Sequence, residues 1–287
     1  MEEYVATWEE IYGKNNIYET ITGRFKYIMK EAEKKTGQKA VVLIDEYDKP
    51  MLDVLGTEME EKNRNILKEF YGTFKAADAH LRFVLLTGVT KFSQISVFSG
   101  FNQPNDISMD YLFDTICGIT EEELYRYFAL PIKEMANQLD YSEKEIKQLL
   151  KKQYDGYHFS NRMIDIYNPF SLMNAFYKMD IGDYWYRSGT PTYLVKLLEG
   201  HHVNMQKLLE EEYRAEFFVD YRADVENPLA MFYQSGYLTI KGYDKIYRSY
   251  TLDFPNEEVR RGFAVLLANS YFGTKNADMK VELLMNG

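Results

Sequence analysis

The chain has 287 residues, about the length of two domains, and its apolar content of 46% suffices for a hydrophobic core, which excludes a disordered tail. A net charge of −10 excludes a strongly basic protein that wraps nucleic acid, although it leaves a local basic groove open. The single cysteine excludes an internal disulfide framework and a cysteine-based zinc cluster. No apolar run approaches the roughly 18 residues of a membrane span, and the acidic start lacks a secretory signal, so we expect a cytoplasmic protein without membrane contact.

The aromatic content is high, with 25 tyrosines and 18 phenylalanines. Tyrosine packs well at domain interfaces because it buries its ring and keeps its hydroxyl in water. Stacking platforms for nucleic-acid bases are the alternative, but such platforms usually come with basic neighbours. Since the aromatic residues are spread along the whole chain, we favour packing.

Residues 1–119 predict an alternation of helices and strands. Apolar residues at helical spacing predict a helix over residues 8–36 that stops at Gly37. The apolar, β-branched run Ala40–Ile44 is typical of a central strand covered on both faces. A helix over about 58–78 and a second apolar strand, Leu81–Leu86, complete a strand–helix–strand crossover with parallel strands. The buried face of that helix is expected to carry Met59, Ile66, Leu67, Phe70 and Phe74.

A long loop over 93–108, above the usual length of a connection, and a short strand at Thr115–Gly118 follow. We place a domain boundary near residue 119. Capping boxes beginning at Thr120 and Ser142 then predict helices to about Leu139 and over 143–153. Similar signals predict further helices over 170–178, 191–212 and 257–272. Asn168 is expected to cap the first of these helices and Asn256 the last. A hairpin with a glycine-containing turn is expected from Tyr237–Ile240 and Tyr247–Phe254. Residues 120–287 therefore predict a mainly helical, winged-helix-like domain.

Two adjacent carboxylates, Asp45 and Glu46, follow the first apolar strand. In P-loop ATPases this Walker B pattern places a magnesium-holding acid and a water-orienting acid at the end of a buried strand. Because neighbouring side chains on a strand point in opposite directions, the two acids can take different roles. Asp45 would hold Mg²⁺ through water, and Glu46 would polarise the attacking water. The alternative is a strand that simply ends in a solvated loop, since the pattern alone is weak.

Polar residues also follow the second strand. Thr87 directly follows Leu86, where this class of ATPase carries a sensor that hydrogen-bonds the attacking water or the γ-phosphate. Thr90 lies one turn further on, and we assign it to nucleotide binding. The alternative for Thr87 is a loop hydroxyl bonded to its own backbone.

Nine segments carry a resemblance to a known family. In chain order they are Val41–Pro50, Leu86–Ser93, Phe98–Gly100, Ile116–Thr120, Tyr154–Tyr157, Tyr167–Ser171, Ser188–Thr192, Tyr237–Ile240 and Thr251–Asn256. With these segments the chain resembles the AAA-ATPase-like family of bacterial proteins, whose members often carry a PD-(D/E)XK nuclease-like domain at the C-terminus. The resemblance implies an α/β fold with an AAA- or RecA-like parallel sheet in residues 1–119, a lid domain in residues 120–287, and ATP and Mg²⁺ as cofactors.

The chain departs from the family in one respect. The resemblance implies a glycine-rich P-loop ending in Gly-Lys-Ser/Thr, whereas Gly13-Lys14 continues to Asn15 and is preceded by Trp8 in place of the earlier glycine. That loop presents backbone N–H groups and a lysine to the phosphates. We therefore expect a partial P-loop fold with an incomplete sheet and an exposed edge, in a fragment or truncated gene product that lacks the P-loop segment and the nuclease-like domain.

Other candidates for chemistry are weaker. His201 and His202 would diverge by about 100° on a helix, which disfavours a shared metal. Cys117 and His158 are expected to be structural. Ser93, Ser96 and Ser99 have little support as nucleophiles. Arg187 and Lys196 have little support as cations that approach a nucleotide in the manner of an arginine finger.

The sequence therefore predicts a fragment of an AAA-like ATPase that retains the Walker B acids and the sensor but not the Walker A loop. ATP hydrolysis by the chain alone is expected to be weak or absent, because charge neutralisation at the phosphates is missing. The alternative is a non-catalytic module derived from such an ATPase. It would contact protein or nucleic acid through the lid domain, or associate with itself through the exposed sheet edge.

Overall fold

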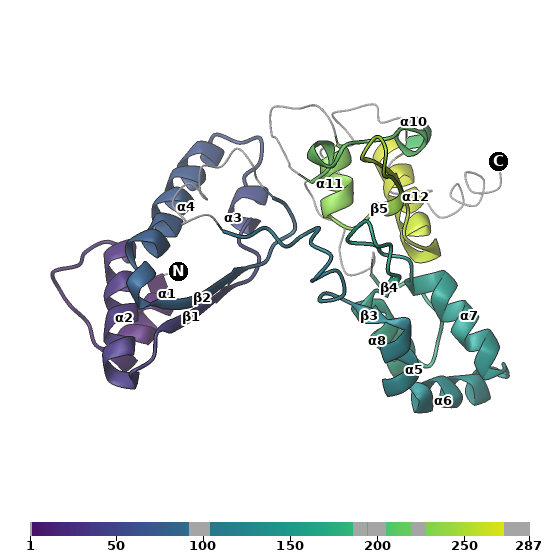
Figure 1. Ribbon diagram of the computed structural model, residues 1–287, viewed down its shortest axis with the longest axis horizontal. Helices are drawn as coiled ribbons and strands as arrows, with labels where there is room; N and C mark the ends of the chain where they lie inside the picture. Colours follow the sequence, from purple (N-terminus) through teal and green to yellow (C-terminus); the bar gives the residue numbers. More distant parts are fainter. Residues whose placement is uncertain (1, 92–103, 186–193, 195–204, 220–227, 273–287) are drawn as a thin grey trace. The chain divides into compact units, whose positions relative to one another are not determined.

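The computed structural model describes residues 2–91, 104–185, 194, 205–219 and 228–272 (Figure 1). They form two compact units, one within residues 1–105 and the other within residues 106–287. Helices and strands both occur, so the fold is mixed α/β. The domain boundary expected near residue 119 falls within the second unit and stays a prediction, because compactness alone does not show which residues fold independently.

The first unit alternates helices and strands. In chain order it contains α1 (Glu2–Tyr12), α2 (Ile21–Thr36), β1 (Ala40–Ile44), α3 (Lys49–Leu52), α4 (Met59–Ala76), a 3₁₀ turn (Asp78–His80) and β2 (Leu81–Leu86). The prediction of one helix over 8–36 is wrong, because two helices form there. Gly13 adopts a positive φ of 104°, and Thr20 caps the second helix by accepting from the Gly23 amide. Gly37 ends α2 in the left-handed conformation, as expected.

The two strands of the first unit pair in parallel, as predicted. The register places Ile44 opposite Leu86, and α4 lies in the connection between the strands. Since parallel strands end at the same edge of a sheet, the polar residues that follow Ile44 and Leu86 are brought next to one another. This edge is where the candidate site is built.

One face of the strand pair is open in the described part of the first unit. Helix α2 packs against β1 and against α4, and these helices bury Ile28, Met29, Leu67 and Phe74. Three apolar side chains of the strands are instead more than half exposed, namely Val41, Leu43 and Phe83. The expectation of a strand covered on both faces is therefore wrong for this part of the chain, because the structure describes helices packed against one face only.

The buried face of α4 is narrower than predicted. Leu67 and Phe74 are buried, but Met59 and Ile66 are nearly half exposed. Tyr71, which lies between Leu67 and Phe74 in the sequence, is also buried and packs its ring against Phe74. The buried apolar side chains of α4 are thus Leu67, Tyr71 and Phe74, which follow one another at spacings of four and three residues, and the first turn of α4 is left in solvent.

The second unit is mainly helical. In chain order its elements are β3 (Ile119–Thr120), α5 (Glu121–Tyr127), α6 (Ala129–Leu139), α7 (Glu143–Tyr154), β4 (Ile166–Tyr167), α8 (Pro169–Lys178), α10 (Met205–Glu210), a 3₁₀ turn (Ala215–Phe217), α11 (Leu229–Gln234), β5 (Thr239–Asp244), β6 (Ser249–Asp253) and α12 (Glu257–Phe272). Both predicted capping boxes are confirmed, at Thr120 and at Ser142. Asn168 and Asn256 also cap the helices predicted for them.

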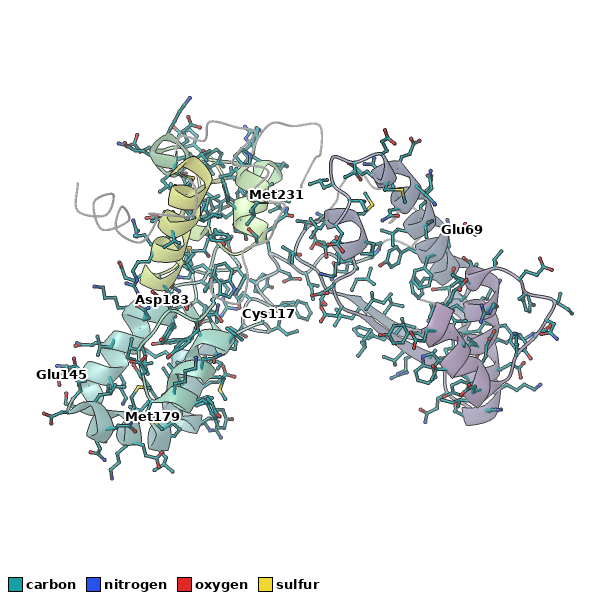
Figure 2. The ribbon with its side chains drawn as sticks, turned by 180° about the vertical axis from the view of Figure 1, so that it is seen from behind. Glu69, Cys117, Glu145, Met179, Asp183 and Met231 are labelled. Atoms are coloured by element: carbon teal, nitrogen blue, oxygen red, sulfur yellow. The ribbon has the colours of Figure 1, made fainter. Side chains whose placement is uncertain are left out.

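Two predictions for this unit are wrong. Thr115–Gly118 is not a strand, because its backbone closes turns, with the Ile116 amide donating to the Phe113 carbonyl. Cys117 is therefore exposed rather than buried in a strand (Figure 2). The predicted helix from residue 121 to 139 is two helices, because Phe128 leaves the helical conformation with φ −115° and ψ 19°.

The predicted hairpin is present as β5 and β6. These strands pair antiparallel with Ile240 opposite Leu252. The glycine is not in the turn, however, since Gly242 lies within β5 at a register irregularity. Of the helix predicted over 191–212, the structure describes Leu194 and α10, and the loop predicted over 93–108 lies mostly outside the described residues.

The core of the second unit is rich in aromatic side chains. The largest fully buried aromatic residues are Tyr154, Tyr167, Phe218, Phe232, Tyr237 and Phe263. Their burial supports packing as the reason for the high aromatic content. Among the helices that the structure describes, none has both the length and the hydrophobicity to cross a bilayer.

Candidate functional site

The ends of β1 and β2 are joined by backbone hydrogen bonds. The Thr87 amide donates to the Ile44 carbonyl at 2.8 Å, and the Tyr47 amide donates to the Thr87 carbonyl at 3.0 Å. The two chain segments thus stay paired for a few residues beyond the strands. This pairing fixes the distance between the acids after β1 and the threonines after β2.

Asp45 and Thr87 contact each other directly. Thr87 Oγ1 donates to Asp45 Oδ1 at 2.6 Å, and the Glu46 amide donates to the same oxygen at 2.9 Å. The Thr87 hydroxyl therefore bonds to the acid and not to its own backbone. Both side chains are exposed, so they are accessible to solvent and to a ligand.

Glu46 stands at a turn. Its φ is 51°, in the left-handed region, which non-glycine residues adopt at an energetic cost of about 1–3 kcal/mol. The chain therefore leaves the extended conformation directly after Asp45, and the alternation of side chains along a strand no longer applies there. The Glu46 side chain is exposed, with no hydrogen bond among the residues that the structure describes.

Asp48 is the residue that the sequence reasoning missed. Its side chain is buried, with 1% exposure, and its carboxylate accepts three hydrogen bonds. The Val89 amide donates to Oδ1 at 3.2 Å, and the Thr90 amide and Oγ1 donate to Oδ2 at 2.5 and 2.7 Å. The sequence signals were a further acid three residues after Asp45 and its place within the segment Val41–Pro50 that carries the family resemblance, and neither gave Asp48 a role. Asp48 thus connects the segment after β1 to the segment after β2.

Thr90 does not join the pair of Asp45 and Thr87. It is buried, with 1% exposure, and its hydroxyl proton goes to Asp48. Its carbonyl oxygen accepts from the Tyr47 hydroxyl at 2.7 Å. Nucleotide binding by Thr90 stays a prediction, while the contacts described here hold the loop.

Gly88 lies against Asp48 and Tyr47. A Cβ atom at position 88 would lie 2.3 Å from Asp48 Oδ1 and 2.7 Å from Tyr47 Cδ1. Contacts below 3.0 Å essentially do not occur for real Cβ atoms. Glycine is therefore required for the two segments to approach this closely.

The donor set at the strand ends fits a magnesium ion held partly by water and phosphate. Asp45 Oδ2 accepts no hydrogen bond from any described residue, so it is available to a cation or to a water of its hydration shell. Within the described parts of the chain, no three His, Cys, Asp or Glu side chains converge as a complete metal site. Mg²⁺ commonly uses one or two carboxylates together with waters and substrate phosphates.

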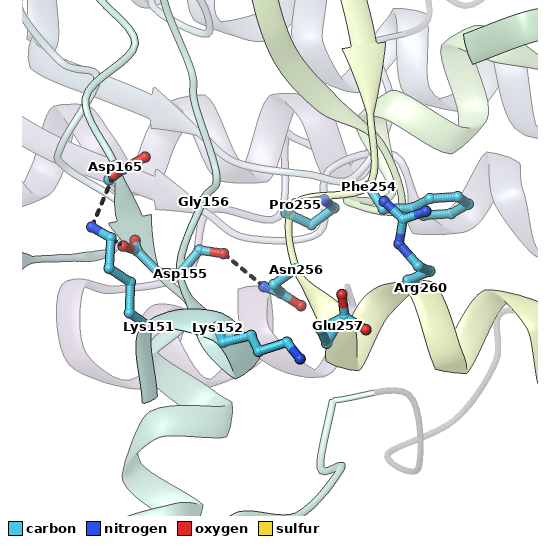
Figure 3. Close-up of a pocket in the computed structure, with 10 residues that line it drawn as sticks. All are labelled: Lys151, Lys152, Asp155, Gly156, Asp165, Phe254, Pro255, Asn256, Glu257 and Arg260. Carbon is cyan, nitrogen blue, oxygen red and sulfur yellow. Dashed lines mark hydrogen bonds and ion pairs between the residues drawn. The ribbon is translucent and has the colours of Figure 1, made fainter. Parts of the chain in front are cut away.

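A second group of charged side chains lines an open cavity of about 240 Å³ in the second unit (Figure 3). Lys151 Nζ lies 3.0 Å from Asp155 Oδ2 and 3.1 Å from Asp165 Oδ2. Burial raises the pKa of Asp155, and the nearby Lys151 opposes that shift. The complete lining has three cationic and three acidic side chains, namely Lys151, Lys152, Arg260, Asp155, Asp165 and Glu257, so the formal charges of the cavity wall cancel and leave little net charge for a ligand.

The other candidates from the sequence take no part in a described site. His158 is buried, and its ring nitrogens lie 2.6 Å from the Ile240 carbonyl oxygen and 2.7 Å from Asp165 Oδ1, which agrees with a structural role. The candidates that lie outside the described residues are Ser93, Ser96, Ser99, Arg187, Lys196, His201 and His202.

Comparisons with known proteins point to one family. Residues 1–98 match the profile of the AAA-ATPase-like family, described as "Predicted AAA-ATPase". Over 240 residues the chain is 35% identical to a protein of Azotobacter chroococcum mcd 1 described as "Uncharacterized protein in vnfD 5'region"; the match covers 83% of this chain and 44% of that protein. The chain thus spans less than half the length of this relative. No solved structure matches the chain.

Proposed function

We propose that the ends of β1 and β2 form the metal-facing and water-facing part of an ATP site, because residues 1–98 match the AAA-ATPase-like family. The observation that carries the proposal is the 2.6 Å hydrogen bond between Thr87 Oγ1 and Asp45 Oδ1. In open α/β sheets, ligands bind beyond the carboxyl ends of the strands, which is where this pair lies.

Each side chain has a defined task in this proposal. Asp45 holds a water of the magnesium shell through its unbonded Oδ2, and Glu46 accepts a hydrogen bond from the attacking water. Thr87 has a single hydroxyl proton, which it donates to Asp45, so its oxygen can only accept from a further partner. It is therefore suited to orient a water molecule, which donates, better than a phosphate oxygen, which accepts. When bound, Mg²⁺ would supply charge neutralisation at the phosphates.

The phosphate-binding half of the site is proposed to come from residues outside this sequence. No segment of the chain reads Gly-x-x-x-x-Gly-Lys-Ser/Thr. In P-loop proteins the backbone N–H groups and the lysine of that motif neutralise the phosphates. By itself the chain should therefore bind Mg-ATP weakly and hydrolyse it little or not at all.

Titration with Mn²⁺ and ATP, followed by the relaxation of water protons, tests this proposal. We expect a dissociation constant on the order of 1 mM for the chain and a value about tenfold higher for Asp45→Asn. Asp53→Asn is the matched control, because Asp53 is exposed on the same segment and lies outside the pair, so binding should stay unchanged. Equal binding by both variants, or no binding by the chain, would contradict the metal site. Binding tighter than about 1 µM would contradict the missing phosphate loop.

The open sheet face favours a second candidate, a non-catalytic module that associates with itself. Val41, Leu43 and Phe83 form an apolar surface on paired strands, and such surfaces are typical of protein contacts. Sedimentation velocity at rising protein concentration tests it. Self-association should be lost in Leu43→Lys and kept in Ile17→Lys, since Ile17 is also exposed but lies outside the strands. A chain that stays monomeric throughout would contradict this candidate.

For the second unit we propose a winged-helix-like lid that contacts a protein or nucleic-acid partner. The support is the order of α11, the β5–β6 hairpin and α12. Ile246 and Tyr247, in the turn of this hairpin, are 85% and 72% exposed. An exposed apolar hairpin tip is suited to contact a partner.

A further inference from the structure

We propose that Asp48 is a positioning residue for the Thr87 hydroxyl and, through Thr87, for Asp45. Its importance for ATP rests on the proposed function, whereas its effect on the loop does not. Asp48 is a buried acid within the segment Val41–Pro50, and the Walker B pattern assigns it no role.

The hydrogen bonds of Asp48 tie it to the main chain of the segment after β2. A buried carboxylate is costly unless hydrogen bonds satisfy its oxygens. Here both oxygens are satisfied by one short segment, since all three donors belong to Val89 and Thr90. Two of these donors are backbone amides, so Asp48 fixes the main chain two and three residues after Thr87.

Tyr47 binds the same segment from the position next to Asp48. Its amide donates to the Thr87 carbonyl, and its hydroxyl donates to the Thr90 carbonyl at 2.7 Å. The Tyr47 carbonyl in turn accepts from the Tyr71 hydroxyl of α4 at 3.3 Å. Tyr47 thus binds the loop from Thr87 to Thr90 at both ends, and Asp48 adds three further bonds at the far end.

The hydrogen bonds of Asp48 do not reach the side chains proposed for the chemistry. None of its three hydrogen bonds involves Asp45 or the Thr87 side chain. Without Asp48, the segment after Thr87 loses three of its bonds and keeps those to Tyr47, so the Thr87 hydroxyl is held less firmly against Asp45. This chain of contacts makes Asp48 a positioning residue and not a catalytic one.

Hydrogen exchange read by NMR on the full chain tests the loop directly. In Asp48→Asn an NH₂ group replaces one of the two acceptor oxygens, so we expect at least one of the Val89 and Thr90 amides to exchange at least about tenfold faster. Thr90→Val is a milder variant that removes the hydroxyl bond alone, and Thr90→Ser restores it. Unchanged exchange at Val89 and Thr90 in Asp48→Asn would overturn the inference.

A double-mutant cycle on Mn²⁺-ATP binding separates positioning from a general loss of structure. Thr87→Val should weaken binding about threefold in the parent chain and have no effect when Asp48→Asn is also present. Its effect should be reduced beside Thr90→Val and kept beside Thr90→Ser. If the effects of Thr87→Val and Asp48→Asn on the free energy of Mn²⁺-ATP binding simply add in the double mutant, the inference is overturned. If the parent chain binds no Mn²⁺-ATP, the proposed function fails, and the exchange rates still decide whether Asp48 holds the loop.

Discussion

Replacing Gly88 with alanine should destabilise the first unit, and replacing Gly72 should stabilise it. At position 88 a Cβ atom would come within 3.0 Å of Asp48 Oδ1 and of the Tyr47 ring. Neither neighbour can retreat easily, because Asp48 is buried and bound to Val89 and Thr90. At position 72, inside α4, a Cβ atom would meet nothing within 4 Å.

The two substitutions are expected to change the free energy of unfolding in opposite directions. Overpacking a tight contact costs about 1–3 kcal/mol, so we expect Gly88→Ala to lower the free energy of unfolding by about 2 kcal/mol. Glycine inside a helix costs about 0.5–1 kcal/mol relative to alanine, so Gly72→Ala should raise it by that amount. With a urea dependence of about 2 kcal/mol per molar, the midpoint for Gly88→Ala falls by about 1 M.

Tryptophan fluorescence reports the first unit separately. The chain has two tryptophans, Trp8 in α1 and Trp185 in the second unit. In a Trp185→Phe background, urea unfolding monitored through Trp8 follows the first unit alone. An unchanged midpoint in Gly88→Ala, or a shift of both alanine variants in the same direction, would contradict a steric need for glycine at position 88.

Two further predictions concern the second unit. Ser142→Ala removes the cap that accepts from the Glu145 amide, so it should lower the stability of this unit by about 1 kcal/mol in urea unfolding read through Trp185, whereas Ser142→Asp should keep it. The Glu258 carboxyl accepts from the Tyr184 and Trp185 amides, and burial raises the pKa of this carboxyl above its unfolded value of about 4.3. The protonated form of Glu258 therefore stabilises the folded unit fully below the unfolded pKa, and this stabilisation is lost as pH rises through the folded pKa. Glu258→Gln should remove this loss, and a variant with the same decline in stability with rising pH as the parent would contradict the assignment.

The strand ends could be predicted from the sequence because their signals are local. Ala40–Ile44 and Leu81–Leu86 are continuous apolar runs, and each is followed at once by polar residues. The contact of Asp45 with Thr87 then follows from parallel pairing alone. This part of the candidate site needed no knowledge of distant contacts.

The role of Asp48 could not be predicted, because its donors lie 41 and 42 residues away in sequence. No local pattern distinguishes a buried acid bound by distant amides from an exposed one. The helix breaks at Gly13 and Phe128 were missed for a related reason. Apolar periodicity continues across both positions, and it is the backbone conformation that changes there.

The open face of the strand pair also lay beyond sequence reasoning. The β-branched runs are typical of strands covered on both sides, yet Val41 and Leu43 are exposed in the described structure. Composition shows that a strand is suited to burial, but it does not show what covers the strand.

Paramagnetic broadening of amide signals by Mn²⁺-ATP is the most direct test of the central claim. The metal should broaden the amides of Glu46 and Thr87 first, and Asp45→Asn should abolish that selectivity. Broadening confined to the second unit, or spread evenly over the chain, would contradict a nucleotide–metal site at the ends of β1 and β2.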